Sequence, residues 1–600
     1  MTLIRRVLAV SVALALCLVS SCTSPSETPS APLPDAGTTP GGEPAGEEDS
    51  PAPEPPRGPD SLEFARLLGY GVNLGNTMEA CNGSNRVPNR DPSVYETMWG
   101  QPVTTQAMVT GMREAGFKTL RIPVAWTNAM DFENGGYTIG GDYLDRVEEI
   151  VNYALNEDMY VIVNDHWDHG WWSLFGHPEQ AGRDKAFEIL TAMWTQIAER
   201  FKDYDHRLVF EGGNEEWGNR FNDRTPFSPS GGALSRDECY KMLTTVAQTF
   251  VDTVRGTGGG NADRFLLIPG YNTNIADTCD NRFKMPSDTA KDKLLLSVHY
   301  YDPFPYAHDG SVEKWGTVQE VEDMSRTLGR MTKYTEQGYG VVLGEWGVLQ
   351  NDNEDRISYY AHFLDICDLY GFVPLLWDTG EMYSKFDGKI TDPEIAELYR
   401  SRSAEARSSL TAAEIVSGAE ANIALTLERA ANRPMFVLPD GEAAAWIMFN
   451  GGGVVYSVGD RYNPDDKTKG VEAGDAEITG AGTYTVSLDL TGVNGGSANG
   501  ITFSALGLAN GEPLFPGHII EIVEVRINGE PAELAGTPYT TSDDGRCTRV
   551  NLYNNWVGKA PGDARVAGGD ISGATPVPLK DYINTRIRTI EVTFALTEGG

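Results

Sequence analysis

The sequence predicts an α/β protein in which a (β/α)8 barrel is followed by a smaller all-β sandwich. Two observations predict the barrel. Short apolar runs alternate with amphipathic helical stretches between residues 61 and 405, and polar or aromatic residues gather where the apolar runs end. A third observation, the change to alternating strands and glycine-containing turns after about residue 422, predicts the sandwich. A doubly wound open sheet is the alternative to the barrel, but we find no glycine-rich phosphate turn after an early strand.

Length and charge limit the classes of protein that the chain can represent. Its 600 residues are too many for a single hydrophobic core, so we expect at least two domains. The 48 Lys and Arg residues against 85 Asp and Glu residues give a net charge of -37. This charge argues against nucleic acid as a partner, because a polyanion needs a basic surface. A neutral polysaccharide would not be repelled.

The N-terminus has the pattern of an export signal. Arg5 and Arg6 precede the apolar run 7–19, which is followed by Ser20-Ser21-Cys22. We therefore expect residues 1–21 to be a signal peptide. The segment before Cys22 resembles a bacterial lipobox, which implies lipidation of Cys22 and an exported protein anchored at the cell surface or envelope. The alternative is an ordinary signal peptide that happens to contain a cysteine.

The segment after the signal differs in composition from everything that follows it. Residues 22–60 are rich in Pro, Gly, Ser, Thr, Ala and acidic residues, lack aromatic residues and have almost no aliphatic ones. Such a segment buries too little apolar surface to offset the entropy of ordering, so we expect a disordered acidic linker.

Eight short apolar strands are expected between residues 61 and 405. Their length and near-continuous hydrophobicity are typical of strands that are buried on both faces of a parallel sheet. We expect them to end near Leu74, Val124, Asn164, Glu211, Pro269, His299, Glu345 and Trp377.

Helical stretches lie between most of these strands. We expect helices over residues 103–115, 143–157 and 184–201, and from about residues 236 and 393. The first has Thr104 and Thr105 as candidate caps and stops at Gly116. Residues 235–238 have the form of a capping box. Asp392-Pro393 supplies a cap and a first-turn proline for the last helix.

Polar side chains recur at the ends of the expected strands, where barrel enzymes carry their chemistry. One such ending means little, but eight in register are hard to explain as accidental caps. The residues are Asn73, Asn76, Arg121, Asn164, Asp165, His166, Asn214, Glu215, Asn272, His299, Tyr300, Tyr301, Glu345 and Trp377.

Two of these residues are carboxylates next to an aromatic-rich turn. Residues 208–217 form an apolar strand that runs into Asn214 and Glu215, and residues 341–347 form another that ends in Glu345 and a tryptophan. Glycoside hydrolysis needs two carboxyl groups, one to protonate the leaving oxygen and one to attack the sugar carbon. The alternative is that both are strand-capping acids in ion pairs.

The barrel segment resembles glycoside hydrolase family 5, the cellulase family of clan A. The resemblance spans residues 61–403 and excludes the C-terminal third. It is carried by the passages Gly71 to Thr77, Leu120 to Val124, Val161 to His166, Phe210 to Glu215 and Leu343 to Glu345, with His299-Tyr300-Tyr301 and Leu376-Trp377 in agreement.

The resemblance implies that Glu215 is the general acid/base and Glu345 the nucleophile. It also implies that Asn214 hydrogen-bonds the sugar 2-hydroxyl and that Arg121 orients the carboxylates. Retaining hydrolysis needs two carboxyls about 5 Å apart with opposite protonation. An arginine beside Glu345 lowers its pKa, whereas the acid/base needs a raised pKa.

Four further site residues follow from the same resemblance. His299 would orient and polarise the carboxylates, and Tyr301 would contact the nucleophile. His166 would line the subsite where cleavage occurs, and Trp377 would stack beneath the sugar ring there. No cofactor is implied.

Two positions depart from the family pattern. The family usually has Pro after the acid/base, whereas this chain has Glu216. The Glu216 side chain either raises the proton affinity of Glu215 or points outward to a cation. We favour the outward orientation. The third-strand motif often reads His-His, whereas this chain has His166-Trp167. This change leaves the ligand-binding role of the second position open and adds aromatic area near the cleft.

Two other classes of function compete with this one. Residues 165–169, Asp-His-Trp-Asp-His, could be ligands of a metal-dependent barrel hydrolase. A non-catalytic glycan-binding protein is the second alternative, although it predicts loss of a catalytic glutamate and both are present. Five tryptophans are candidate sugar platforms, each more easily explained by burial: Trp126, Trp171, Trp172, Trp217 and Trp346.

Within the family, the motifs favour an endo-acting β-1,4-glucanase acting on cellulose, mixed-linkage glucan or xyloglucan. Mannan and xylan remain alternatives, because subsite loops rather than core motifs decide the substrate. We expect a monomer that contacts membrane only through its N-terminal lipid. No disulfide framework is expected, although a Cys81–Cys279 bridge is left open.

The C-terminal third reads as a junction at residues 406–421 and a β-sandwich at 422–600. Residues 484–490 alternate with period two, and residues 519–527 run into Asn528-Gly529, a hairpin signal. Accessory carbohydrate-binding modules often accompany the family, so we expect either a sugar-binding face or a structural spacer. The candidate aromatic residues are Trp446, Tyr462, Tyr553 and Trp556.

Overall fold

The structure is a computed structural model. It describes residues 58–597 except 83–89, 135, 350–352, 434–435, 460, 543–544, 580–581 and 583. The predicted signal peptide, Cys22 and nearly all of the 22–60 linker lie outside the described residues.

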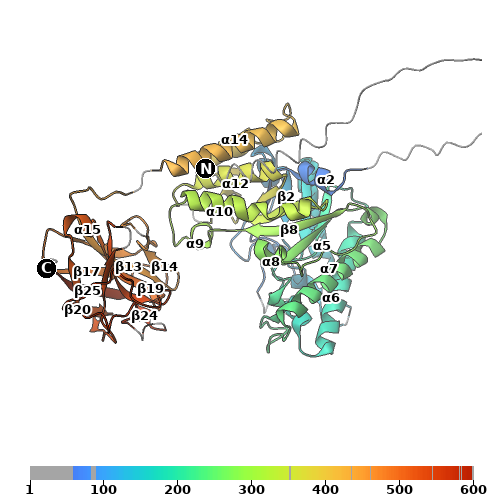
Figure 1. The fold of residues 1–600 in the computed structure, drawn as a ribbon. Helices are drawn as coiled ribbons and strands as arrows, with labels where there is room; N and C mark the ends of the chain where they lie inside the picture. The colour runs from blue at the N-terminus through green and yellow to red at the C-terminus, as the bar shows by residue number, and fades with distance from the viewer. Residues whose placement is uncertain are drawn as a thin grey trace, which may run out of the picture. The chain divides into compact units, whose positions relative to one another are not determined.

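Eight parallel strands close into a barrel, which confirms the predicted fold class (Figure 1). Strand β1 pairs with β2 on one side and β10 on the other, so the sheet has no free edge. The strands are β1 (Gly71–Asn73), β2 (Thr119–Ile122), β5 (Tyr160–Asn164), β6 (Leu208–Glu211), β7 (Leu266–Asn274), β8 (Leu294–Tyr300), β9 (Gly340–Trp346) and β10 (Val373–Leu376).

Seven of these strands end within two residues of the predicted position. Strand β7 is the exception, because it extends from the expected end at Pro269 to Asn274. Its pairing with β8 shifts register between these two residues. The irregularity carries Asn272 and Thr273 through positive φ values of 47° and 50°, which no hydrophobic pattern signals.

Helices cover the outside of the barrel, and their caps explain where they begin. Thr105 accepts a hydrogen bond from the Met108 N–H, Ser235 and Glu238 form a capping box, and Asp392 caps a helix with Pro393 at its first position. The longer helices are α2 (Ser61–Leu68), α4 (Gln106–Glu114), α5 (Gly141–Asn156), α6 (Gln180–Arg200), α7 (Arg236–Gly256), α10 (Val318–Gly329), α12 (Arg356–Tyr370) and α13 (Pro393–Ser401).

The barrel interior is a packed core. Helix α2 closes one end, where Phe64 stacks on Phe265 with ring centroids 3.6 Å apart. Phe64 and Leu68 join inward-facing residues of the strands, among them Leu267 and Val342, in one buried cluster. This filling leaves the opposite end, at the C-termini of the strands, for chemistry.

The predicted junction is a helix, and the sandwich starts later than expected. Helix α14 (Ala412–Ala431) begins at a capping box of Thr411 and Glu414 and lies beside α12 (Figure 1). Asn422, the predicted start of the sandwich, instead donates a hydrogen bond from α14 to Asp365. The alanine-rich composition is typical of a helix, and this helix continues past the predicted end of the junction at residue 421 to Ala431.

Two antiparallel sheets form the C-terminal domain, and their facing side chains share one core. The first sheet contains β13 (Ala444–Gly451), β14 (Val454–Tyr456), β16 (Ala476–Glu477), β19 (Phe503–Ala509), β22 (Thr540–Ser542) and β23 (Thr548–Asn554). The second contains β15 (Glu472–Gly474), β17 (Gly482–Asp489), β20 (Ile519–Ile527), β21 (Glu530–Pro531) and β25 (Thr589–Thr597). The predicted Asn528-Gly529 hairpin is confirmed, with both residues at positive φ.

The aromatic residues of the sandwich are less exposed than expected. Trp446 is fully buried and Tyr553 is 3% exposed, so the predicted four-residue aromatic face is wrong. Trp556 is 74% exposed.

The cysteines at 81 and 279 are free thiols, so the possible bridge is absent from the described structure. Within the same residues, no helix has both the length and the apolar character needed to cross a bilayer.

Candidate active site

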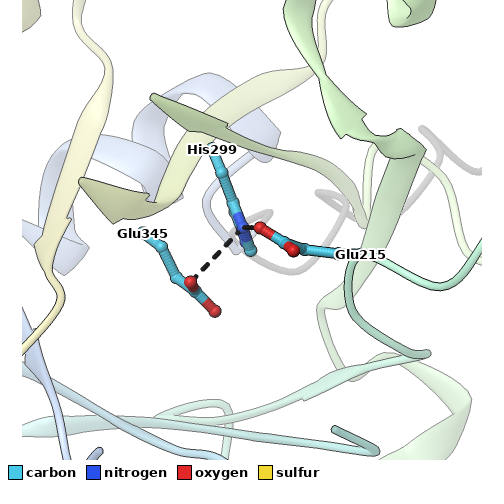
Figure 2. Close-up of side chains that lie close together, drawn as sticks. All are labelled: Glu215, His299 and Glu345. Carbon is cyan, nitrogen blue, oxygen red and sulfur yellow. Dashed lines mark hydrogen bonds and ion pairs between the residues drawn. The ribbon is translucent and has the colours of Figure 1, made fainter. Parts of the chain in front are cut away.

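The two glutamates predicted to be catalytic meet at the C-terminal end of the barrel. Glu215 lies in the turn after β6, Glu345 lies near the end of β9, and His299 from β8 stands between them (Figure 2). Nδ1 of His299 is 3.0 Å from Oε1 of Glu215 and 3.5 Å from Oε2 of Glu345. One oxygen from each carboxyl and this nitrogen all lie within 4.8 Å of one another.

Arg121 from β2 organises the floor of the site. Its guanidinium is fully buried and donates to Glu345 at 3.0 Å, to Glu211 at 2.7 Å and to Asn214 at 2.8 Å. A further bond at 2.9 Å goes to the side-chain oxygen of Asn73. A planar guanidinium can serve four acceptors at once, so Arg121 fixes side chains from β1, from β6 and its following turn, and from β9.

The nucleophile candidate has further partners. The Tyr301 hydroxyl donates to Oε2 of Glu345 at 3.2 Å, and Nδ1 of His166 lies 4.0 Å from Oε1. The rings of His166 and Trp377 lie parallel with centroids 5.6 Å apart. Burial and the nearby positive charge of Arg121 hold the pKa of His166 well below its usual range, so this ring is neutral. Every predicted site residue of the barrel is therefore brought into one cluster.

The turn that carries Glu215 is held from two sides. Asn272 of β7 donates to the backbone oxygen of Glu215 at 2.6 Å. Glu216 folds inward, and its Oε1 accepts the backbone N–H of Asn214 at 2.8 Å. The expectation that Glu216 points outward to a cation is wrong, because its side chain is fully buried.

The protonation order in this structure differs from the expected one. Burial raises the pKa of Glu345, and this effect outweighs the opposing charges of His299 and Arg121. Burial also acts on Glu215, but the hydrogen bond and charge of His299 outweigh it and lower the pKa. The contacts of Arg121 and His299 with the carboxyls agree with the roles that the resemblance implies, but the lowering of the Glu215 pKa by His299 was not predicted. Because Glu215 and Glu345 both interact with His299, the two carboxyls release their protons as a coupled pair.

Three residues of the site were not predicted as functional. Glu211 is fully buried and pairs with Arg121, Asn73 donates to the backbone oxygen of Gly344, and Asn272 holds the turn that carries Glu215. Each stands at a strand end, so the polar position was visible in the sequence. Their hydrogen-bond partners come from other strands, so those contacts could not be predicted from the sequence.

The candidate metal segment at residues 165–169 is engaged by protein groups. Asp168 accepts hydrogen bonds from the backbone and hydroxyl of Thr127, and Nε2 of His169 lies 2.8 Å from the Asn128 side-chain oxygen. Among the described residues, the one set of three acidic, His or Cys side chains close enough to share an ion is the Glu215, His299 and Glu345 cluster itself. We assign no metal to it.

The five candidate sugar-platform tryptophans are buried. The least covered of them, Trp172, is 3% exposed. Trp167, by contrast with these five, is only half-buried, and the Arg220 guanidinium lies 4.6 Å from its ring centroid.

A profile of the cellulase family, glycosyl hydrolase family 5, matches residues 84–382. An endoglucanase A of Paenibacillus barcinonensis is 33% identical over 377 residues, covering 56% of this chain and 89% of that protein. The chain belongs to glycosyl hydrolase family 5. Within the family, a xyloglucan-specific endo-β-1,4-glucanase of Bacteroides ovatus is 34% identical over 361 residues, covering 56% of this chain and 68% of that protein.

Solved structures of the family agree. A GH5-4 broad-specificity endoglucanase from an uncultured bovine rumen ciliate has a TM-score of 0.51 and 32% identity, covering 58% of this chain and 99% of that one. A second, from Ruminococcus champanellensis with bound cellotriose, has the same TM-score and identity over 57% of this chain and 99% of that one. The family domain is a glycoside hydrolase of the endoglucanase type, and the sandwich lies outside the matched residues.

Proposed function

We propose that the chain hydrolyses β-1,4-linked glucan internally, with retention of configuration, through Glu345 as nucleophile and Glu215 as acid/base. The observation that carries the mechanism is the closeness of the two carboxyls, whose nearest atoms lie within 4.8 Å. Inverting enzymes keep their carboxyls about 6.5–9.5 Å apart to fit a water, whereas retaining enzymes bring them to about 5–5.5 Å.

In the first step a carboxylate oxygen of Glu345 attacks the anomeric carbon, and the bond to the leaving oxygen breaks. Glu215 gives its proton to that oxygen. Arg121 and Tyr301 hold Glu345 by its two oxygens, which fixes the direction of attack. A sugar oxygen that replaces His299 beside Glu215 removes the main interaction that lowers the pKa of Glu215, so substrate binding favours the protonated acid.

In the second step Glu215, now ionised, takes a proton from water. The resulting attack on the anomeric carbon releases Glu345 and gives a product with the original β configuration. Asn214 is held by Arg121 through its side-chain oxygen, so its amide group is free to donate to a sugar hydroxyl.

The relatives support a β-glucan as substrate. One is named as xyloglucan-specific, one as an endoglucanase, and one solved structure holds cellotriose. We therefore propose cellulose, mixed-linkage glucan or xyloglucan, with β-mannan and xylan as the second choice.

The deciding experiment measures reducing ends released from carboxymethylcellulose, mixed-linkage glucan, xyloglucan, mannan and xylan, with and without EDTA. We expect turnover of at least one β-glucan. Turnover of mannan or xylan alone would change the substrate, and activity that EDTA abolishes would favour the metal-dependent alternative.

We also propose that the sandwich binds glycan through Trp556. The residue follows β23, its ring lies 6.2 Å from that of Phe503, and its exposure gives a free aromatic face. In a Glu345→Ala background, Trp556→Ala should weaken adsorption to insoluble glucan roughly tenfold, because loss of about 50–60 Å² of apolar contact costs about 1.4 kcal/mol. Val523→Ala, at a 61% exposed residue of the same domain, is the control. Equal adsorption of the Trp556→Ala and Val523→Ala variants would contradict glycan binding through Trp556 and favour a role as a structural spacer.

Lipidation of Cys22 stays a proposal, as does anchoring of the exported protein at the cell surface or envelope. Cys22→Ala should move the protein from the membrane fraction to the soluble exported fraction, since the acyl chains supply the membrane affinity. Incorporation of labelled palmitate into wild type but not the variant is the measurement. Equal fractionation of the two proteins would contradict the anchor.

A further inference from the structure

Glu216 is a buried acid directly beside the acid/base. It follows Glu215 in the turn after β6, yet its side chain turns inward and is fully buried. Oε1 accepts the Asn214 N–H at 2.8 Å, and this bond closes the short loop of backbone on which Glu215 sits. Asn214 is itself fixed to Arg121. The position of Glu216 therefore sets the geometry of both neighbours.

The second oxygen of Glu216 has an unusual environment. Oε2 is buried and has no hydrogen-bond partner among the described residues. The charges of Glu215, in the turn after β6, and of Glu211, at the end of β6, act on this carboxyl, and Glu216 acts in turn on Asp165 after β5. Arg121 contacts Glu211, which accepts its Nε–H at 2.7 Å. An ionised carboxylate in this position would be buried among acids without a counter-ion, which is costly.

Burial and the neighbouring acids favour the neutral form of Glu216, and together they outweigh the backbone hydrogen bond from Asn214, which lowers the pKa. Burial raises the pKa of Glu216 from its ordinary value of 4.5 to about 8, and the charges of Glu215 and Glu211 add to this effect. Burial also raises the pKa of Asp165, with contributions from Asp168 and Glu216. Below about pH 8 the group behind the acid/base is a neutral carboxylic acid.

We propose that Glu216 is a positioning residue that works as a neutral carboxylic acid, holding the Asn214–Glu215 turn, and that its ionisation ends activity at alkaline pH. When the proton leaves, a new negative charge appears in the buried cluster beside Glu215. The charge repels the acid/base and strains the turn. The proposal rests on the hydrolase function proposed above but can be tested in part without substrate.

The sign of the stability effect follows from the two protonation states. The unfolded chain releases this proton near pH 4.5, whereas the folded protein keeps it to about pH 8. Folding stability from this group is therefore greatest below pH 4.5 and is lost as the pH rises to about 8. Glu216→Gln keeps the acceptor for Asn214 but has no proton to lose, so it should escape this loss.

The first test is thermal unfolding of the full chain without substrate. The Tm of Glu216→Gln relative to wild type should rise by several degrees between pH 5 and pH 8. Glu336→Gln, at an exposed position, is the matched control and should follow wild type at every pH. A Tm difference that is the same at pH 5 and pH 8 would overturn the proposal.

The second test is kinetic. At pH 6, Glu216→Ala should lower kcat about 10–100-fold with little change in KM, because a misplaced catalytic group costs this much, and Glu216→Gln should recover most of the loss. On 2,4-dinitrophenyl β-cellobioside, whose leaving group needs no acid, wild type should lose activity above about pH 8. Glu216→Gln should not.

The outcomes separate this proposal from the proposed function. If wild type cleaves no glucan or glucoside at pH 6, the proposed function fails while the unfolding test still stands. If Glu216→Gln is folded but as slow as Glu216→Ala, or keeps the alkaline loss, the neutral-acid role is wrong.

Discussion

Replacing Glu345 by alanine should lower kcat on β-glucan by about 10⁵-fold or more, because the variant has no group to attack the anomeric carbon. Folding should survive, since Arg121 keeps Glu211 as a buried counter-ion. Reducing-end release and circular dichroism of the purified variant measure the two effects. Glu336→Ala, at an exposed position, should match wild type in both.

The space left by the Glu345 carboxylate offers a sharper test. Azide should enter it and attack from the same side, so a dinitrophenyl β-glucoside should give an α-glycosyl azide. Loss of activity without this product would not identify the nucleophile. Activity within tenfold of wild type would contradict the assignment.

Glu215→Ala should lower kcat on polysaccharide about 10³-fold, because the leaving sugar oxygen then departs without a proton. On a dinitrophenyl β-glucoside the first step needs no acid, so a rapid burst of dinitrophenol should precede a slow steady state. Stopped-flow absorbance measures both phases.

Azide again distinguishes the role. It should attack the glycosyl-enzyme from the side that Glu215 occupied, accelerate the slow phase and give a β-glycosyl azide. Equal loss of activity on both classes of leaving group, with no burst and no azide effect, would mean that Glu215 is not the acid/base.

The barrel and the clustering of the candidate site residues could be predicted from the sequence because both depend on strand ends. His299 and Glu345 lie at the ends of buried apolar runs and Arg121 lies one residue before the end of β2, and the closed parallel sheet brings all such ends to one face. The positions in the cluster could therefore be identified without any knowledge of side-chain direction.

Side-chain direction is where prediction failed. Nothing in the local sequence distinguishes an outward Glu216 from an inward one, since the inward orientation depends on the hydrogen bond that the side chain accepts from the Asn214 N–H. The proton order of Glu215 and Glu345 depends in the same way on the His299 ring, whose Nδ1 lies 3.0 Å from Glu215 and 3.5 Å from Glu345.

The domain boundary was missed for a different reason. Helix α14 buries few of its side chains and has little hydrophobic periodicity, so its sequence predicts a short junction rather than a helix of full length. Its hydrogen bond from Asn422 to Asp365 joins residues 57 apart in the chain. Contacts of this kind are tertiary and leave no local pattern.

The central claim, a retaining two-carboxylate mechanism, is tested most directly by the configuration of the first product. Proton NMR should be recorded within minutes of adding enzyme to cellopentaose or a xyloglucan oligosaccharide, before mutarotation. The closeness of Glu215 and Glu345 predicts that the β-anomer appears first and the α-anomer only later. Initial formation of the α-anomer would show inversion and contradict the account.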